Sequence, residues 1–312
     1  MSGLAGLDRH LEEAYGFEVT RLTALEPWAP DGVQRVDRAG GVPWVARVSP
    51  VERSIDAAEG DAEILRFLAA HDYPAERCAD EKPVTVFDGR AVIVTELVAG
   101  TNARSDSSTE TFRRVGALNG LLHSLPVGPG AVSRPAGGWH HVSINGGGRR
   151  TDVDALLPVM DRVAAGLSKD DLSLYGQLRD ELEAVDGCED LPHALVNIDL
   201  GGPNVIVGPD GSMTTVDWTG SGRGPRVHAF STMSYGDLAR VDAFVAGYRE
   251  HATLDDAELD RLADALPVHS LVLDCWMFAH TGRPIAQITP QRAQVREHAK
   301  RVADRARQAV RS

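Results

Sequence analysis

The sequence predicts an α+β fold in which a β-rich N-terminal part is followed by a mainly helical C-terminal part. Short runs of β-branched and aromatic residues, separated by turn residues, occur in the first hundred positions. The strongest of them is a hairpin pattern over residues 83–98 with Asp88-Gly89 as its turn. From residue 108 onward, apolar residues recur mainly at helical spacing. One further hairpin pattern, over residues 195–218, stands among the helices. Strands and helices segregated in this way are typical of the α+β class.

The composition is that of a globular chain with one large or two small domains. Its 312 residues include 32 Lys and Arg against 45 Asp and Glu, a net charge of −13. This excess of acids disfavours a nucleic-acid partner. The three cysteines (Cys78, Cys188 and Cys275) lack metal-ligand spacing, which indicates reduced thiols in a cytoplasmic protein. We find no signal peptide and no apolar run of about 18 residues, so no membrane partner is expected. We expect a monomer or homodimer.

The elements of the N-terminal part are expected in a regular order. A helix over 8–15 precedes strands over 17–22, 34–38 and 43–48, and a second helix over 56–70 precedes the 83–98 hairpin. Ser54 is a plausible N-cap of the second helix. The polar stretch 101–107 follows the hairpin and is the best candidate for a boundary. We therefore expect one domain over 1–100 and another over 101–312.

The C-terminal part is expected to be helical. Helices are predicted over 108–125, 152–166 and 171–186, and again beyond residue 226. Asp255 and Glu258 form a capping-box pattern. The loop-rich stretch 127–151 contains His140-His141, but adjacent histidines without further ligands do not make a metal site. The glycines of 219–226 lack the Gly-x-Gly-x-x-Gly spacing and the βαβ context of a dinucleotide-binding fold.

The hairpin stretch 195–218 gathers two acids and an amide. Asp199 and Asn204 lie in a tight loop after a strand, and Asp217 closes the second arm of the hairpin. A strand end is rigid, so it can hold oxygen ligands at the fixed separations that Mg²⁺ requires. The alternative is an ordinary hairpin whose Asp and Asn residues form turns. We adopt that interpretation for Asp210 only.

Asp199, four intervening residues and Asn204, followed by a hairpin that ends in Val-Asp217-Trp218, resembles the catalytic and metal-binding segment of the aminoglycoside phosphotransferase family. The resemblance implies a two-lobed, protein-kinase-like fold, with a nucleotide-binding lobe over 1–100 and a catalytic, acceptor-binding lobe over 101–312. It implies that Asp199 accepts the proton of the acceptor hydroxyl. It also implies that Asn204 and Asp217 hold Mg²⁺ against the nucleotide phosphates.

Arg47 is similar to the basic residue on the family's third strand, which contacts the α- and β-phosphates. An arginine can do so in bidentate fashion and stays charged. The alternative is an edge-strand arginine that faces water. The resemblance also implies an acid on the helix over 56–70 that pairs with Arg47. The helical phase favours Asp61 and side-chain length favours Glu63, and we expect Asp61.

Three other segments resemble the family. Glu96-Leu-Val98 is similar to the hinge, whose backbone groups would meet adenine. The loop over 26–33 lies where the lobe folds over the phosphates, although it has a single glycine. His123, in Gly120-Leu-Leu-His123, is similar to a histidine with a packing and hydrogen-bonding role. Arg223 and Arg226, after Asp217, either orient phosphate or anchor their loop.

One residue pair departs from the family, which usually has His-Gly or His-Thr before the catalytic Asp where this chain has Asn197-Ile198. Asn197 can still donate and accept hydrogen bonds, and we interpret it as a variant support of the loop. We expect ATP (with GTP as the alternative) and Mg²⁺ as cofactors, and transfer of the γ-phosphate to a hydroxyl of an aminoglycoside-like antibiotic or amino sugar. The alternatives are a metabolic kinase for a sugar or choline-like alcohol, a catalytically weak nucleotide-binding pseudokinase, and a non-enzymatic interaction module.

Overall fold

The computed structural model describes residues 4–25, 32–106, 108–127, 132–234 and 237–312. The chain divides into two compact units, which are described separately below. Unit 1 is Met1–Asn102 with Asn204–Thr219, and unit 2 is Ala103–Pro203 with Gly220–Ser312. The structure differs from the expected division because residues 204–219 belong to the same unit as the N-terminal part.

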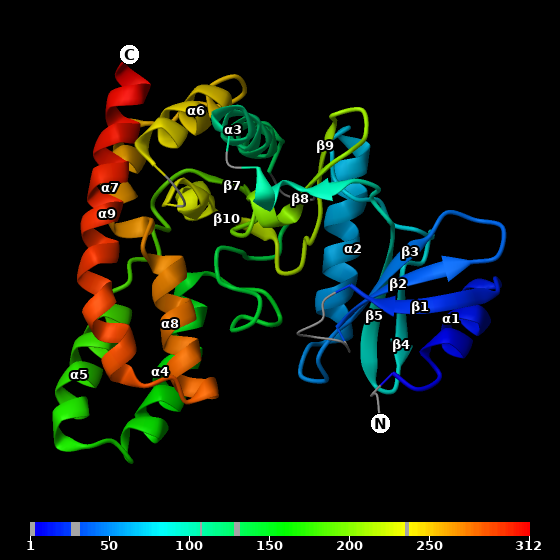
Figure 1. Ribbon diagram of the computed structural model, residues 1–312, viewed down its shortest axis with the longest axis horizontal. Helices are drawn as coiled ribbons and strands as arrows, with labels where there is room; N and C mark the ends of the chain where they lie inside the picture. Colours follow the sequence, from blue (N-terminus) through cyan, green and yellow to red (C-terminus); the bar gives the residue numbers. More distant parts are fainter. Residues whose placement is uncertain (1–3, 26–31, 107, 128–131, 235–236) are drawn as a thin grey trace. The chain divides into compact units, whose positions relative to one another are not determined.

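Within its described residues, unit 1 contains a five-stranded antiparallel sheet with the order β1-β2-β3-β5-β4 (Figure 1). Its strands are β1 (Val19–Ala24), β2 (Val33–Arg38), β3 (Trp44–Val48), β4 (Val84–Phe87) and β5 (Arg90–Glu96). The expected strands and the 83–98 hairpin are present, although β1 begins two residues later than expected. Phe17 instead packs its ring against Tyr15 and Trp44, at 6.3 and 4.7 Å between centroids. Residues 26–31 of the loop expected over the phosphates lie outside the described residues.

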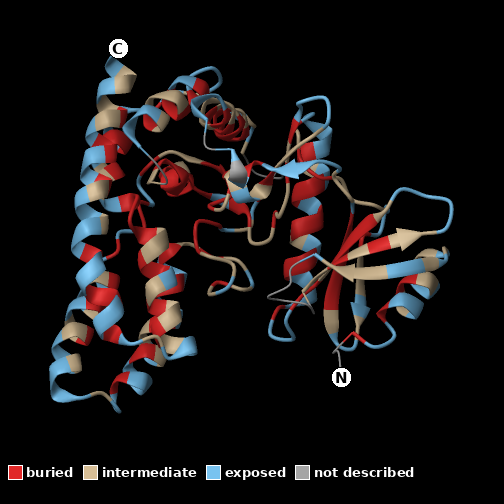
Figure 2. Cartoon of the chain, in the orientation of Figure 1, coloured by how far each residue is buried: buried red, intermediate tan, exposed pale blue. Residues whose placement is uncertain are grey.

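Two helices pack in unit 1, α1 (Leu7–Tyr15) and α2 (Ile55–Ala70). The Ser54 hydroxyl accepts a hydrogen bond from the Ala57 N–H, so the predicted N-cap is confirmed. Helix α2 has a buried face and an exposed face (Figure 2). The buried face includes Asp61, whereas Glu63 is exposed. The phase predicted for α2 is therefore correct.

The hairpin over 204–219 is joined to unit 1 by hydrogen bonds to the segment after α2. Its arms are β8 (Val205–Val207) and β9 (Met213–Thr215), and β8 also pairs with β6 (Thr101–Asn102). The Thr215 N–H donates to the Pro74 carbonyl, and the Glu76 N–H donates to the Thr215 carbonyl, each at 2.8 Å. Asp210 accepts bonds from the N–H and hydroxyl of Ser212, which confirms its interpretation as a turn residue.

Unit 2 is mainly helical and contains a short antiparallel pair, β7 (His193–Val196) and β10 (Gly222–Pro225) (Figure 1). Its α-helices are α3 (Thr109–Ser124), α4 (Arg149–Ala164), α5 (Lys169–Glu183), α6 (Leu238–Tyr248), α7 (Asp256–Ala265), α8 (Val268–Thr281) and α9 (Ile285–Arg311). The 3₁₀ segments are η1 (Ala103–Ser105), η2 (Gly202–Asn204, whose last residue is in unit 1) and η3 (Arg226–Ser234). The capping box of Asp255 and Glu258 is present, as predicted.

Helices α3 and α6 cross so closely that glycines are required at the contact. A Cβ atom on Gly116 would lie 2.0 Å from the Phe244 carbonyl oxygen, and one on Gly247 would lie 1.8 Å from the Arg113 carbonyl oxygen. These contacts are with backbone atoms, which cannot swing away as a side chain can. The crossing places His123 against Tyr248, whose hydroxyl lies 3.1 Å from His123 Nδ1. The predicted packing and hydrogen-bonding role of His123 is confirmed.

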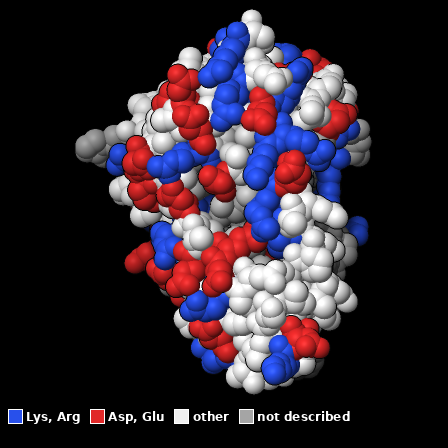
Figure 3. Space-filling view, turned by 90° about the vertical axis from the view of Figure 1, so that its left-hand side faces the viewer, with Lys and Arg blue, Asp and Glu red and all other residues white. Residues whose placement is uncertain are grey.

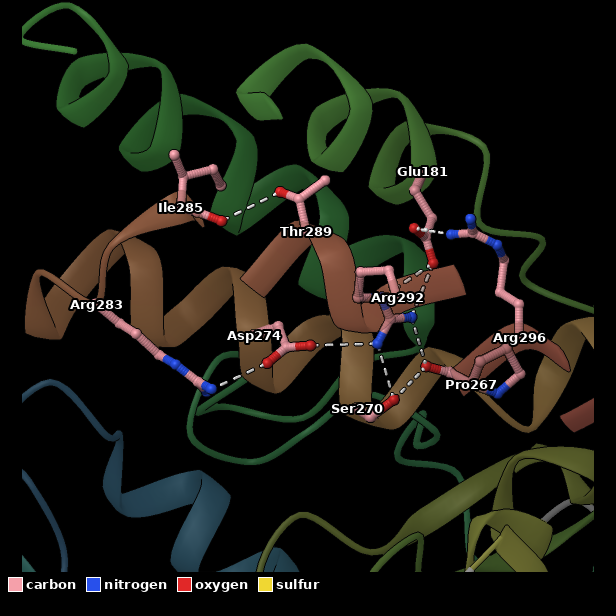
Figure 4. Close-up of polar contacts among 9 residues, drawn as sticks. All are labelled: Glu181, Pro267, Ser270, Asp274, Arg283, Ile285, Thr289, Arg292 and Arg296. Atoms are coloured by element: carbon pink, nitrogen blue, oxygen red, sulfur yellow. Dashed lines mark hydrogen bonds and ion pairs between the residues drawn. The ribbon is translucent and has the colours of Figure 1, made fainter. Parts of the chain in front are cut away.

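A buried arginine ties three helices of unit 2 together (Figure 4). Arg292 of α9 pairs with Glu181 of α5 at 2.8 Å and with Asp274 of α8 at 3.3 Å, and it also donates to the Ser270 hydroxyl at 3.0 Å. A buried guanidinium is tolerated when its donors find acceptors in this way. Elsewhere on α9, Arg305 pairs with Asp242. Figure 3 shows one face of the molecule, on which basic and acidic side chains are interspersed.

One helical stretch in the described ranges, Asp256–Thr281, is long and apolar enough to cross a membrane by length and composition. This is weak evidence, because half of its most apolar window is buried and core helices pass the same test. The stretch contains α7 and α8. Leu271, Val272 and Cys275 of α8 pack in a hydrophobic core with residues of α4 and α5.

Candidate active site

Arg47, the residue expected to contact the phosphates, forms a buried ion pair in unit 1. Its Nη1 lies 2.8 Å from Glu76 Oε2, and the two side chains are 17% and 2% exposed. The Thr95 hydroxyl donates to the same Glu76 oxygen at 2.8 Å. Burial tends to lower the pKa of Arg47, but the fields of Glu76 and Asp217 outweigh it and raise that pKa. Arg47 is therefore a fixed cation and not an edge-strand arginine facing water.

The expected pairing of Arg47 with Asp61 is wrong. Asp61 is buried on α2 as predicted, but its ion pair is with Arg53, at 2.7 Å. Arg53 lies just before α2 and also donates to the Ala57 carbonyl, which places its guanidinium beside the first turns of the helix. The acid that reaches Arg47 is Glu76, which lies in the loop after α2. Helical periodicity cannot identify a residue in that loop.

Glu76 also connects Arg47 to the expected metal ligands. Its Oε1 accepts the backbone N–H of Asp217 at 2.7 Å. Asp217 has φ +61, a left-handed conformation that is uncommon outside glycine and is often found at functional sites. The N–H of the preceding Val216 donates to the Asn204 carbonyl at 2.9 Å. Glu76 and this backbone contact thus bring Arg47, Asn204 and Asp217 together in unit 1.

The oxygens of Asn204 and Asp217 fit a hard divalent cation. An amide oxygen and a carboxylate are ligands that Mg²⁺ accepts, and Mg²⁺ commonly completes its shell with phosphate oxygens and water. Among the described residues, no group of three or more His, Cys, Asp and Glu could hold a metal ion by itself.

The expected hinge residues follow the sheet of unit 1. Glu96 ends β5 and pairs with Trp44 of β3. The N–H of Glu96 donates to the Arg77 carbonyl and the N–H of Leu97 donates to the Pro43 carbonyl. Since these two donors are already used, an adenine at this segment would rely on the Glu96 carbonyl and the Val98 N–H.

Asp199, the expected catalytic base, follows β7 in unit 2. The Asn197 side-chain oxygen accepts the Asp199 N–H at 3.0 Å, so Asn197 supports the loop as predicted. The next carbonyl, that of Leu200, accepts a bond from the Thr232 hydroxyl of η3 at 3.0 Å. The backbone on either side of the carboxylate is therefore held in place, while 21% of the Asp199 side chain stays exposed.

Two histidines contact the Asp199 carboxylate. His140 Nδ1 lies 3.4 Å from Oδ2, and His269 Nε2 lies 3.5 Å from Oδ1. Burial alone would raise the pKa of Asp199, but the hydrogen bond from His140 and the positive charge of Arg149 contribute to lowering that pKa overall. Asp199 is therefore a carboxylate at neutral pH and can accept a hydrogen bond from an alcohol.

Sequence reasoning missed Glu76, His269 and the role of His140. His140 belongs to a pair of adjacent histidines in the sequence, whereas its partner in space, Asp199, is 59 positions further along the chain. His269 is one polar residue at the start of a helix and gave no signal. Arg226 pairs with Glu258 and donates to the Thr253 carbonyl, so of its two alternative roles it has that of anchoring its loop.

The antiparallel sheet of unit 1 and the mainly helical unit 2 give the chain a kinase-like fold. A family model for the phosphotransferase enzyme family (APH) matches residues 22–265. The chain belongs to this family, and the predicted class of small-molecule phosphotransferase is confirmed. A search of curated protein sequences finds no match.

Solved structures share the protein-kinase-like fold, which confirms the predicted fold class. An amicoumacin kinase in complex with AMP-PNP and Ca²⁺ has a TM-score of 0.64 at 18% identity, over 95% of this chain and 92% of that chain. A choline kinase from Streptococcus pneumoniae has a TM-score of 0.62 at 11% identity, over 96% and 98%. A macrolide 2'-phosphotransferase from Brachybacterium faecium has a TM-score of 0.55 at 17% identity, over 95% and 97%.

Proposed function

We propose that this protein transfers the γ-phosphate of ATP, in an Mg²⁺-dependent reaction, to a hydroxyl group of a small molecule. The observation that carries the proposal is the position of Glu76. One buried carboxylate holds the guanidinium of Arg47 with one oxygen and the backbone of Asp217 with the other. A phosphate-binding cation and a metal-binding carboxylate are thereby fixed relative to each other, as positioning of a triphosphate requires.

Each side chain has a distinct role in this proposal. Arg47 binds the α- and β-phosphates, and the backbone at Glu96 and Val98 binds adenine. Asn204 and Asp217 hold Mg²⁺, which supplies charge neutralisation on the phosphates when it is bound. Asp199 accepts the hydrogen bond of the acceptor hydroxyl and takes its proton. GTP in place of ATP is the alternative nucleotide.

The acceptor is proposed to be an antibiotic or amino sugar that carries a hydroxyl, with a sugar or choline-like alcohol as the metabolic alternative. Solved relatives named for amicoumacin, choline and macrolides support a small hydroxyl compound without choosing among them. A catalytically weak pseudokinase is less well supported, because Asn197 bonds the loop at the position where the family histidine is missing. The free thiols of Cys78, Cys188 and Cys275 suit a reducing cytoplasm.

The test is a screen of hydroxyl acceptors with purified protein, ATP and Mg²⁺. Aminoglycosides, amino sugars, macrolides, sugars and choline are incubated separately, and mass spectrometry detects the addition of one phosphate. Phosphorylation of at least one acceptor, lost when Mg²⁺ is removed by chelation, is expected. Nucleotide binding without phosphorylation across the panel would support the pseudokinase, and absence of nucleotide binding would contradict the proposal.

A further inference from the structure

The carboxylate of Asp199 is held on both sides, and this feature lies entirely within unit 2. His140 Nδ1 faces Oδ2 at 3.4 Å and His269 Nε2 faces Oδ1 at 3.5 Å, so each oxygen has its own imidazole. His140 lies in the loop between α3 and α4, and His269 is the second residue of α8. Such distances are long for N–H···O bonds, but hydrogen bonds in a free active site often shorten only when substrate binds.

We propose that His140 and His269 are positioning residues for the phosphoryl transfer, which clamp the Asp199 carboxylate from two sides and fix the direction in which it receives the acceptor hydroxyl. This proposal rests on the proposed function. Asn197 accepts a hydrogen bond from the backbone N–H of Asp199, whereas the two imidazoles contact its carboxylate oxygens. Contacts on both oxygens fix the carboxylate before the reaction, which matters because a misplacement of about 1 Å can cost 100-fold in rate.

The position of His140 is set by a buried framework around Trp139. The Trp139 N–H donates to both oxygens of Asp152, at 2.9 and 3.1 Å, and the Ser143 hydroxyl donates to Asp152 Oδ1 at 2.6 Å. Asp152 is fully buried on α4. A Cβ atom on Gly220, which has φ +76, would lie 2.7 Å from His140 Cβ. The loop can approach Asp199 because residue 220 is a glycine.

The position of His269 is set by α8 and by the same tryptophan. Its ring meets Trp139 edge-on, with centroids 6.0 Å apart, and Trp139 in turn meets Trp276 of α8 at 5.7 Å. The side chains of His140 and His269 are only 16% and 12% exposed. Partly buried rings that pack in this way have few alternative rotamers, so they can act as rigid donors.

His269 acts through an N–H group and not through charge. Burial lowers the pKa of His269, and nearby Arg149 and His140 lower it further against the opposing field of Asp199. His269 is therefore neutral at pH 7 and donates to Asp199 when the proton is on Nε2. The titratable groups that act on Asp199 are the two histidines and Arg149, of which Arg149 is the cation. A neutral amide at either histidine position should therefore replace the imidazole.

The kinetic test compares substitutions that keep an N–H donor at each histidine position with substitutions that remove it. Asparagine places its amide nitrogen close to the position of His140 Nδ1, and glutamine does so for His269 Nε2. We expect His140→Asn and His269→Gln to keep kcat within about 3-fold, whereas His140→Ala and His269→Leu lose about 10- to 100-fold in kcat with an unchanged KM for ATP. Variant His251→Ala, which alters an exposed histidine of unit 2 beyond the end of α6, is the control with wild-type kcat. Full kcat in the His140→Ala/His269→Leu double variant, or equal losses in the amide variants, would overturn the proposal.

A second measurement needs no turnover and separates this proposal from the proposed function. Long-range ¹H–¹⁵N correlation spectra of the full chain identify which ring nitrogen of each histidine carries the proton. We expect the proton on Nδ1 of His140 and on Nε2 of His269, and a tautomer reversal of one ring in Asp199→Asn, whose amide NH₂ needs an acceptor. Unprotonated nitrogens facing Asp199 in the wild type would refute the clamp even if the acceptor screen succeeds. If that screen fails, these spectra still show whether the two imidazoles carry their protons on the nitrogens that face Asp199.

Discussion

Replacement of Glu76 is expected to damage both the stability of unit 1 and the binding of nucleotide. Glu76→Ala leaves the guanidinium of Arg47 without its ion-pair partner, and it leaves two donors, the Thr95 hydroxyl and the Asp217 N–H, without their acceptor. Removal of one partner of a buried ion pair costs about 3–5 kcal/mol of unfolding free energy. We therefore expect a loss of about 4 kcal/mol, measured by urea unfolding.

The same substitution should weaken nucleotide binding by at least about 10-fold, or about 1.4 kcal/mol, because neither Arg47 nor Asp217 is held in position. Isothermal titration with a non-hydrolysable ATP analogue and Mg²⁺ measures this. The double variant Arg47→Met/Glu76→Leu removes both charges and should recover part of the stability, but none of the nucleotide affinity. Glu63→Ala, an exposed acid on α2, is the control and should change stability by less than about 0.5 kcal/mol. A loss below about 1 kcal/mol in Glu76→Ala, with unchanged nucleotide affinity, would refute the reasoning.

Three further predictions concern other parts of the chain. Burial holds the pKa of His123 and of His228 at about 3, far below the ordinary 6.5. The unfolded chain therefore binds protons that the folded chain does not, and the unfolding free energy falls below pH 6.5 by about 1.4 kcal/mol per pH unit for each histidine. His228→Gln should remove one such contribution in urea unfolding between pH 6.5 and 5, and an unchanged slope would contradict this. Asn197→His should change kcat by less than about 3-fold, because the Asn197 oxygen already accepts the Asp199 N–H; a 10-fold gain would show that the loop lacks support. Gly247→Ala should cost about 1–3 kcal/mol of unfolding free energy through its contact with α3, whereas Gly176→Ala, which meets nothing within 4 Å, should gain up to about 1 kcal/mol; equal thermal shifts would refute the packing argument.

Periodicity and turn chemistry were sufficient to predict the elements that position the site. The phase of α2, the Ser54 cap and the 205–216 hairpin are local properties of the sequence, and each is found in the structure. The hairpin's membership of unit 1 depends instead on hydrogen bonds from Thr215 to the segment after α2. Contacts between residues that are distant in the chain leave no periodic signal.

The residues of the candidate site could likewise be predicted only where a local sequence pattern marked them. Asp199 and Asp217 belong to a continuous segment that resembles the family's catalytic and metal-binding segment, so they could be named from the sequence. Glu76 and His269 act through partners far away in the chain, and the prediction of Asp61 failed because the choice was restricted to one helix. A loop acid such as Glu76 is found only when the fold brings it beside Arg47.

In the proposed reaction, Mg²⁺-dependent nucleotide binding depends on the carboxylate of Asp217. Acceptance of the proton from the acceptor hydroxyl depends on a different carboxylate, that of Asp199. The most direct measurement follows Mg²⁺-dependent ATP binding and acceptor phosphorylation in parallel for the wild type, Asp199→Ala and Asp217→Ala. We predict that Asp199→Ala binds Mg²⁺ and ATP like the wild type but does not phosphorylate the acceptor, and that Asp217→Ala loses the Mg²⁺-dependent binding itself. Wild-type rates in Asp199→Ala, or intact Mg²⁺-dependent binding in Asp217→Ala, would contradict the claim.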